Sequence, residues 1–396
     1  MMMKRAYMDH NATAPVRAGA AAAVAHALLV TGNASSVHAE GRAARKLIEE
    51  ARLAVAALVH ARPAEVIFTS GGTEAANMAL YAAKTALGVR RIVLSAVEHD
   101  ALRAAAASSG LEVEVLPVDG SGVSDLKALE LLLAAPIEGK TLVALMAANN
   151  ETGVVQPLAA AAALARAAGA YVLTDAVQVV GRVPVDFAAL GVDMLLISGH
   201  KLGAPQGVGA LIWRDGLAFE ALIQGGGQER RRRSGTENVP GIAGFGAAAR
   251  EAAAEIDDVA KIARLRDRLE AGLKAAVPEV VIFGAGAERL PNTSLFSAPG
   301  LDAETLLMAL DLDGFAVSSG AACSSGKVAH SHVLKAMGVD DELAKGAIRV
   351  SLGLENTEED IDRFVQSWSR AAARAGEKLV SLSKKASAGA FAKVES

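Results

Sequence analysis

The chain has 396 residues, of which 52% are hydrophobic and 21% charged, with a formal net charge of −4. This composition indicates a large globular protein of two or more domains and excludes a disordered chain. The acidic balance argues against a nucleic-acid partner, which would require a basic face. No apolar run has the length of a membrane span or a signal-peptide core, so we expect a cytoplasmic protein with no membrane partner. The single cysteine, Cys323, excludes an intramolecular disulfide and a cysteine-rich metal site, and no metal is expected.

Short runs rich in Val, Ile and Leu alternate with alanine-rich stretches of helical periodicity in the first part of the chain. This alternation predicts an α/β fold in which a mainly parallel sheet carries helices on both faces. A long charged helix is predicted over 251–276, and a smaller mixed segment begins near residue 280. The predicted strands are 66–68, 91–94, 112–116, 141–146, 171–174, 194–197 and 209–212, with helices such as 74–87 and 158–168 between them.

These patterns divide the chain into four parts. We expect an N-terminal segment, 1–15, that packs with the smaller domain, and a large domain over 16–255. A smaller α+β domain follows over 256–380. The tail over 381–396 is polar, contains lysines and is predicted to be disordered.

The first functional signal is that distinctive polar clusters follow the ends of predicted strands, where open α/β sheets bind their ligands. The stretch 69–77, Thr-Ser-Gly-Gly-Thr-Glu-Ala-Ala-Asn, comes after a strand and opens a helix. The glycines of this stretch and the free N–H groups of that helix could hold an anion such as a phosphate. A glycine turn of this kind is equally compatible with a purely structural role.

A second pair of clusters supports the phosphate interpretation. Asp175-Ala-Val-Gln178 follows one predicted strand, and Ser198-Gly-His-Lys201 follows the next. A buried aspartate beside a pyridine nitrogen keeps that nitrogen protonated, and a lysine amine can form a Schiff base with a pyridoxal cofactor. Isolated Asp and Lys residues usually lie on the surface, but their joint arrangement indicates pyridoxal 5'-phosphate.

These motifs resemble those of the cysteine desulfurases of the NifS and IscS type, within the class V aminotransferase-like enzymes that use pyridoxal phosphate. The resemblance extends from Met8-Asp-His-Asn-Ala-Thr-Ala-Pro15 to Arg349-Val-Ser-Leu-Gly353. It implies the type I fold of pyridoxal-phosphate-dependent transferases, in which a large domain with a mainly parallel mixed sheet is joined to a smaller α+β domain. It also implies a homodimer.

The resemblance assigns roles to residues of the cofactor site. Lys201 would hold the cofactor, Asp175 would pair with its ring nitrogen, and Gln178 would contact its ring oxygen. His99, in Val-Glu-His-Asp, would stack on the ring and take part in catalysis. Asn150 would lie near the ring oxygen and the substrate carboxylate, and Thr236 would reach the phosphate across a dimer interface. The other phosphate contacts would come from Gly72, Thr73, Ser198 and His200.

The run Ser318-Ser-Gly-Ala-Ala-Cys323-Ser-Ser-Gly-Lys327 predicts a loop whose backbone can move at low cost. A buried free cysteine is the alternative, but the neighbouring residues are turn formers. The run is not a nucleotide-binding P-loop, because five residues separate Gly320 from Gly326 where that motif has four. The resemblance makes Cys323 the residue that receives sulfur from L-cysteine as a persulfide.

Arg349 stands on an apolar run that predicts a strand of the smaller domain. A guanidinium group can bind a carboxylate through two hydrogen bonds, and the resemblance places this one on the α-carboxylate of the substrate. The Arg230–Arg232 run predicts a solvated, positively charged surface that could attract an acidic sulfur acceptor. No role is assigned to His330.

The implied reaction converts L-cysteine to L-alanine and passes sulfur from Cys323 to a protein acceptor, for iron–sulfur clusters or other sulfur-containing cofactors. Three alternatives remain open. A selenocysteine lyase would share most of the scaffold. A transaminase or kynureninase-like enzyme of the same class would not need the cysteine loop. A non-catalytic sulfur-transfer partner would not need the cofactor residues.

Overall fold

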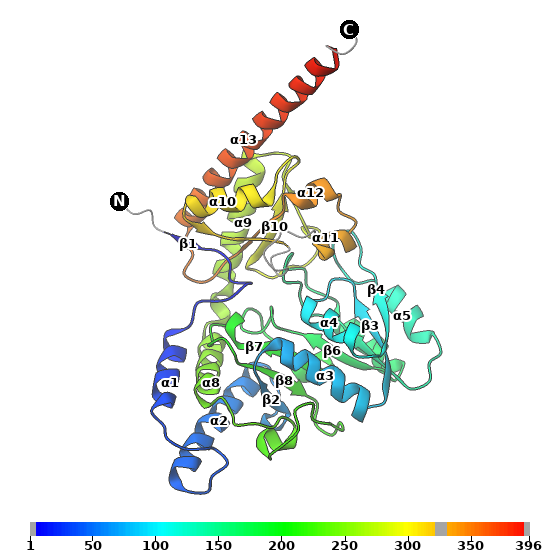
Figure 1. Ribbon diagram of the computed structural model, residues 1–396, viewed down its shortest axis with the longest axis vertical. Coiled ribbons are helices and arrows are strands. Elements are labelled where there is room, and N and C mark those ends of the chain that lie inside the picture. Colours follow the sequence, from blue (N-terminus) through cyan, green and yellow to red (C-terminus); the bar gives the residue numbers. More distant parts are fainter. Residues whose placement is uncertain (1–4, 321–330, 392–396) are drawn as a thin grey trace.

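The computed structural model describes residues 5–320 and 331–391. Figure 1 shows a larger part built around a central sheet, a smaller part above it, and a C-terminal helix that projects away from the smaller part. The two parts meet at an apolar cluster in which Val97 and Met146 of the larger part pack with Phe283, Leu295 and Leu334 of the smaller part.

A seven-stranded sheet, in the order β2-β8-β7-β6-β5-β3-β4, forms the centre of the larger part. Its strands pair in parallel except β8, which is antiparallel to both β2 and β7. The predicted α/β class and the seven predicted strands are therefore confirmed, with small shifts of the strand ends. The strands are β2 (Val66–Thr69), β3 (Val89–Ser95), β4 (Glu112–Leu116), β5 (Lys140–Ala144), β6 (Tyr171–Asp175), β7 (Met194–Ser198) and β8 (Gly209–Trp213).

Helices cover both faces of this sheet. Successive side chains of a strand point to opposite faces, so apolar residues of each strand pack against the helices on either side. In β2, Val66 and Phe68 pack in one apolar cluster and Ile67 packs in the other. The first cluster includes residues of α1 (Ala18–Leu28), α2 (Ala39–Leu58), α5 (Leu126–Ala134), α6 (Leu158–Ala167), α7 (Phe187–Leu190) and α8 (Val239–Ala254). The second includes residues of α3 (Gly72–Ala86) and α4 (Asp100–Ser108). Short 3-10 turns are η1 (Pro63–Glu65), η2 (Gly199–Lys201), η3 (Gln228–Arg231) and η4 (Ile256–Asp258).

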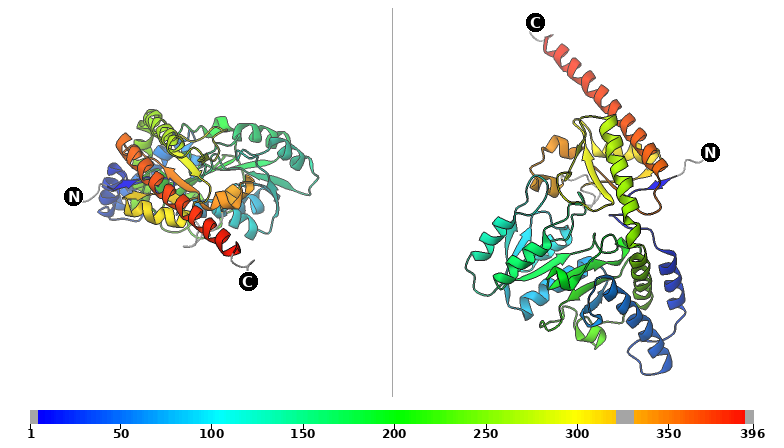
Figure 2. Two further views of the ribbon diagram at one scale, coloured as in Figure 1. Left: turned by 90° about the horizontal axis from the view of Figure 1, so that it is seen from above. Right: turned by 180° about the vertical axis from the view of Figure 1, so that it is seen from behind.

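The smaller part is built on a four-stranded antiparallel sheet in the order β12-β13-β10-β9. Its core centres on Phe296, against which Phe364 and Trp368 pack edge to face, with ring centroids 6.3 and 5.4 Å away. Helices α9 and α13 run side by side along this sheet (Figure 2). The elements are β9 (Val281–Ile282), β10 (Thr293–Ser297), β12 (Ser318–Ser319), β13 (Ile348–Ser351), α9 (Val259–Ala276), α10 (Ala303–Leu312), α11 (His332–Ala336), α12 (Asp341–Lys345) and α13 (Glu358–Phe391).

The N-terminal segment lies against the smaller part. Strand β1 (Ala6–Tyr7) pairs in parallel with β11 (Phe315–Ala316), and Asp9 forms a β-bridge with Ser351. The chain then crosses to the larger part, where α1 begins at Ala18. This segment is therefore positioned to contribute to a site between the two parts. The domain limits themselves stay a prediction.

One helix differs from the prediction. The helix expected over 251–276 is interrupted: α8 ends at Ala254, η4 follows, and α9 begins at Val259. Asp257 and Asp258 account for the break, because Asp is unfavourable in a helix interior and favourable beside the N-terminus of the next helix. Residues 381–391 continue α13 as a proline-free stretch rich in Ala, Lys and Ser, and the expected disorder of the tail over 381–396 stays a prediction. Leaving aside the undescribed residues, no helix is both long and apolar enough to cross a bilayer.

Candidate active site

A cavity of about 230 Å³ lies beyond the carboxyl ends of β6 and β7, between the two parts of the molecule. The parallel strands bring their polar ends to one edge of the sheet, as expected for an open α/β fold. All predicted site residues except Thr236 and Cys323 line this cavity: Gly72, Thr73, His99, Asn150, Asp175, Gln178, Ser198, His200, Lys201 and Arg349.

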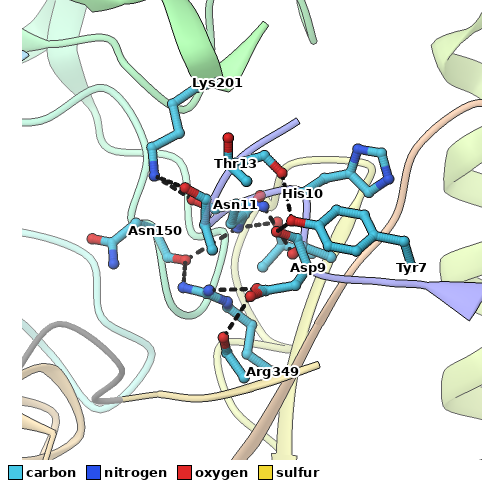
Figure 3. Close-up of polar contacts among 12 residues, drawn as sticks. Tyr7, Asp9, His10, Asn11, Thr13, Asn150, Lys201 and Arg349 are labelled. Atoms are coloured by element: carbon cyan, nitrogen blue, oxygen red, sulfur yellow. Dashed lines mark hydrogen bonds and ion pairs between the residues drawn. The ribbon is translucent and has the colours of Figure 1, made fainter. Parts of the chain in front are cut away.

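Lys201 reaches the cavity from η2, directly after β7. Its Nζ donates hydrogen bonds to the carbonyl oxygens of Asn11 and Ala12, at 2.6 and 2.8 Å. Figure 3 shows the amine turned toward these carbonyl groups of the N-terminal segment. The N-terminal segment therefore holds the lysine side chain at the edge of the cavity.

Asp175 ends β6 and its Oδ1 accepts a hydrogen bond from the Val177 amide at 2.9 Å. Burial raises the pKa of this carboxyl, while the nearby His99 and Lys201 lower it. Because desolvation disfavours the carboxylate, a cationic group placed against Asp175 would stabilise it. The site thus suits a protonated ring nitrogen.

Two histidines face the cavity with fixed orientations. His99 caps α4 by accepting a 3.1 Å hydrogen bond from the Ala101 amide at Nδ1. The Nδ1 atom of His200 lies 3.2 Å from the Thr13 hydroxyl oxygen. Burial, with a smaller contribution from Lys201, lowers the pKa of His200 to about 4, so its imidazole is neutral at physiological pH.

The N-terminus of α3 forms one end of the cavity. Gly72 and Thr73 open this helix, and Ser198 lies beside them at the end of β7. A Cβ atom added at Gly72 would contact Val177 Cγ2 at 3.4 Å and Ser198 Cβ at 3.6 Å, so a side chain here would occupy part of this end. Helix N–H groups with neighbouring hydroxyls form a site suited to an anion such as a phosphate.

Arg349 extends from β13 on the opposite side of the cavity and is only 3% exposed. Its Nη2 donates to Asp9 Oδ1 at 2.8 Å, and its Nη1 donates to the carbonyl oxygen of Asn150 at 3.0 Å (Figure 3). Its buried Nε has no hydrogen-bond partner among residues 5–320 and 331–391. An unsatisfied buried donor is costly, so this guanidinium is suited to bind a further carboxylate.

Two predicted residues do not line this cavity. Thr236 is exposed beside a separate hollow of about 120 Å³ that includes Ser70 and Arg233. Its predicted contact is with the phosphate of a second subunit, so that role stays a prediction. Cys323 and the unassigned His330 lie outside the described residues. In the described ranges, no group of three or more His, Cys, Asp or Glu side chains could hold a metal ion.

Two residues of this network, Asn11 and Asp9, were not among the predicted site residues. Asn11 accepts from Lys201 and from Gln178 Nε2 at its carbonyl oxygen, while its Nδ2 donates to the Asn150 carbonyl at 3.1 Å. Asp9 pairs with Arg349 and also accepts a 2.7 Å hydrogen bond from the Ser318 hydroxyl. Both belong to the Met8–Pro15 motif, which marked the resemblance and could have drawn attention to them.

Comparisons with known proteins identify the family of the chain. Residues 6–364 match the family model for class-V aminotransferases. The chain is 45% identical over 371 residues to a cysteine desulfurase of Cereibacter sphaeroides, covering 92% of this chain and 95% of that one. It is 41% identical to the cysteine desulfurase IscS of Dictyoglomus turgidum, covering 91% and 93%. The crystal structure of a NifS-like protein from Rickettsia africae matches with a TM-score of 0.86 at 37% identity, over 93% of this chain and 99% of that one. The chain belongs to the class-V aminotransferase family and, within it, to the cysteine desulfurases of the NifS and IscS type.

Proposed function

We propose that this protein is a cysteine desulfurase that takes sulfur from L-cysteine, releases L-alanine and retains the sulfur on Cys323 as a persulfide. One observation carries the proposal: a single cavity combines the Lys201 amine and the Asp175 carboxyl with the buried Arg349 guanidinium, whose Nε is unsatisfied. Relatives that are 41–45% identical over most of the chain carry the name cysteine desulfurase.

The residues present fit pyridoxal phosphate, the cofactor of this family. The α3 N-terminus with Gly72, Thr73, Ser198 and the neutral His200 would hold the phosphate. Asp175 would face the ring nitrogen, where a cation would offset the cost of its own burial. The other proposed contacts are with the ring oxygen and the ring face, from Gln178, Asn150 and His99.

The bound cofactor supplies an electron sink that weakens the bonds at the substrate Cα. Arg349 would bind the α-carboxylate of L-cysteine and so fix the orientation of Cα. Lys201 would attach the cofactor between turnovers and, once displaced by the substrate amine, would remove the Cα proton with its free amine. The backbone carbonyls of Asn11 and Ala12 keep that amine close to the cavity.

Cys323 would act as the nucleophile. Its thiolate attacks the substrate sulfur, so a sulfur–sulfur bond forms as the bond between sulfur and the substrate Cβ breaks. The electron pair remains with the carbon framework, Cβ takes up a proton, Lys201 would return a proton to Cα, and L-alanine leaves. An acceptor thiol then attacks the persulfide, removes the outer sulfur and restores the Cys323 thiol.

The sulfur acceptor is proposed to be a protein of iron–sulfur cluster or other sulfur-cofactor synthesis, in the cytoplasm. The exposed Arg230 and Arg231 would favour an acidic acceptor surface. A homodimer is proposed so that Thr236 can reach the phosphate bound by the other subunit.

A Cys323→Ser variant tests the assignment directly. Serine preserves the size of the side chain, but its hydroxyl has a pKa far above that of a thiol and cannot supply the nucleophile. We expect the variant to bind pyridoxal phosphate and to change its absorbance when cysteine is added. Formation of alanine and sulfide should fall by about a thousandfold or more, as in other enzymes that lose their nucleophile.

Wild-type protein, treated with cysteine in the absence of reductant, should carry one additional reducible sulfur on the Cys323 peptide by mass spectrometry. If the serine variant released alanine and sulfide at the wild-type rate, the persulfide mechanism would be wrong. A lyase that expels sulfur directly would then replace it.

A further inference from the structure

Glu151 is a buried carboxyl group that the proposed mechanism does not use. It is 4% exposed, and its Oε2 accepts a 2.6 Å hydrogen bond from the Ser331 hydroxyl. The same oxygen lies against Gly320, where an added Cβ would approach it to 2.8 Å. Gly320 and Ser331 are the described residues on either side of the segment that contains Cys323. One carboxylate oxygen therefore accepts a hydrogen bond from Ser331 and lies next to Gly320, the two described residues that flank that segment.

The backbone that carries Glu151 is held firmly. Its amide and the Thr152 amide both donate to Asn149 Oδ1, at 2.9 and 3.0 Å. The turn closes at Gly153, whose φ of +76° favours glycine and whose amide donates to the Asn149 carbonyl at 2.9 Å. A Cβ at Gly153 would also lie 2.8 Å from Thr293 Cβ. The Glu151 side chain therefore starts from a fixed point.

The same turn holds the proposed substrate anchor. The residue before Glu151 is Asn150, whose carbonyl oxygen accepts hydrogen bonds from Arg349 Nη1 and Asn11 Nδ2. Adjacent residues of one rigid turn thus contact the group that would bind the substrate carboxylate and the two described residues that flank the segment that bears the nucleophile. This arrangement fixes Ser331 and its neighbour Gly320 relative to Arg349, which would bind the substrate.

The electrostatic setting leaves Glu151 able to accept this hydrogen bond in either protonation state. Burial raises its pKa to about 7, and Asp100 raises it further, whereas the Ser331 hydroxyl, Arg349 and His99 lower it. A neutral carboxyl and a carboxylate both retain an oxygen that can accept from the Ser331 hydroxyl. The contact with Ser331 is therefore available throughout the neutral pH range.

We propose that Glu151 is a positioning residue for sulfur transfer, which holds Ser331 by a hydrogen bond, beside Gly320, at a fixed placement relative to Arg349. The placement of Ser331, beside Gly320, would in this way favour transfer of the substrate sulfur to Cys323. The inference rests on the proposed function, because it assigns Glu151 to the sulfur-transfer step alone. Binding of cysteine should not depend on it.

Single-turnover experiments on the holoenzyme separate these steps. In Glu151→Ala, the rate of persulfide formation on Cys323 should fall about 10- to 100-fold, since a misplacement of about 1 Å can cost about a hundredfold. The absorbance change on adding cysteine should keep its wild-type concentration dependence, because Lys201 and Arg349 are unchanged. Glu151→Gln preserves the size and one acceptor oxygen, so it should restore a rate close to that of wild type.

Variants of Ser331 test whether Glu151 acts through this hydroxyl. Ser331→Ala should slow persulfide formation, whereas Ser331→Thr, which retains a hydroxyl, should not. The Ser331 hydroxyl also caps α11 through the Leu334 amide, and the threonine variant controls for that loss. The matched control is Ser294→Ala, because Ser294 is buried and its hydroxyl has no partner within the part of the chain that the structure describes. The double variant Glu151→Ala/Ser331→Ala should be no slower than the slower single variant.

The outcomes distinguish this inference from the proposed function. Wild-type enzyme that forms neither alanine nor persulfide would refute the proposed function itself. Active wild type with an equally fast Glu151→Ala variant would refute the positioning role. So would a Glu151→Ala variant that loses its absorbance response to cysteine together with its rate, since Glu151 would then act on binding. If Glu151→Ala does not fold, the Ser331 variants decide the question by the same assay.

Discussion

The two sides of the active-site cavity are assembled in different ways. On the side of the large sheet, Asp175, Ser198 and Lys201 stand at or just beyond the ends of the neighbouring strands β6 and β7. On the opposite side, Arg349 comes from the small sheet and is held by Asp9 and Asn150, which are 340 and 199 residues away in sequence. The proposed cofactor-binding groups therefore come from one sheet edge, whereas the proposed substrate anchor, Arg349, depends on three distant segments that meet.

This difference predicts that cofactor binding and substrate binding can be disrupted separately. Changes at the sheet edge should affect the attachment of the cofactor. Changes on the side of the small sheet should weaken the binding of L-cysteine and leave the cofactor in place. Glu151, in the turn 149–153, lies beside the residues that flank the cysteine-bearing segment, so its replacement should affect neither binding step strongly.

The largest effect is expected for Lys201→Ala, on the side of the large sheet. Loss of the amine removes both the covalent attachment and the base, so alanine production should fall by about a thousandfold or more. Borohydride treatment should couple the cofactor to Lys201 of the wild type, as seen by peptide mass spectrometry, and not to the variant. Lys201→Arg should behave like the alanine variant, because it retains the charge without a nucleophilic amine. An active arginine variant would contradict this assignment.

A smaller effect is expected for Arg349→Ala, on the opposite side. Loss of a charge-assisted hydrogen-bonded pair costs roughly 1.5–3 kcal/mol, or about tenfold to a hundredfold in the dissociation constant for cysteine. Spectroscopic titration with cysteine measures this constant, and the cofactor content should match that of wild type. Arg349→Lys should give an intermediate constant. Unchanged cysteine dependence in the alanine variant would show that Arg349 does not bind the carboxylate, and loss of cofactor would show that the two sides are not independent.

The smallest effect is expected for Glu151, in the turn 149–153, and is a change of the free energy of unfolding with pH. Glu151 keeps its proton up to about pH 7 in the native protein, whereas an exposed carboxyl releases it near its ordinary pKa of 4.5. Between these values the unfolded chain binds fewer protons, so native stability is lost as the pH rises. Relative to Glu151→Gln, the free energy of unfolding should fall by about 1–2 kcal/mol between pH 5 and pH 6.5, as measured by urea denaturation of the holoenzyme. A difference that stays constant with pH would mean that the native carboxyl is already ionised at pH 5.

Much of the cofactor side could be predicted from the sequence. Asp175 and Lys201 each follow an apolar run that predicts a buried strand, and parallel strands place such residues together without any further information. The interruption between α8 and α9 could not be predicted from periodicity, because the charged pattern continues across it while Asp257 and Asp258 end the helix locally. Helical propensity similarly carries α13 to Phe391 despite the polar composition.

By itself, the sequence determined the α/β class, the chemical groups for a pyridoxal phosphate site and the family to which the chain belongs. It did so because strand periodicity and local motifs are properties of short stretches of chain. Only the tertiary structure decided that Asp9 pairs with Arg349 and that the Asn11 carbonyl accepts a hydrogen bond from the Lys201 amine. It also decided that Glu151 accepts a hydrogen bond from Ser331 and lies next to Gly320. These contacts join residues far apart in sequence, and their geometry is set by packing between the two parts of the molecule, which no local pattern encodes.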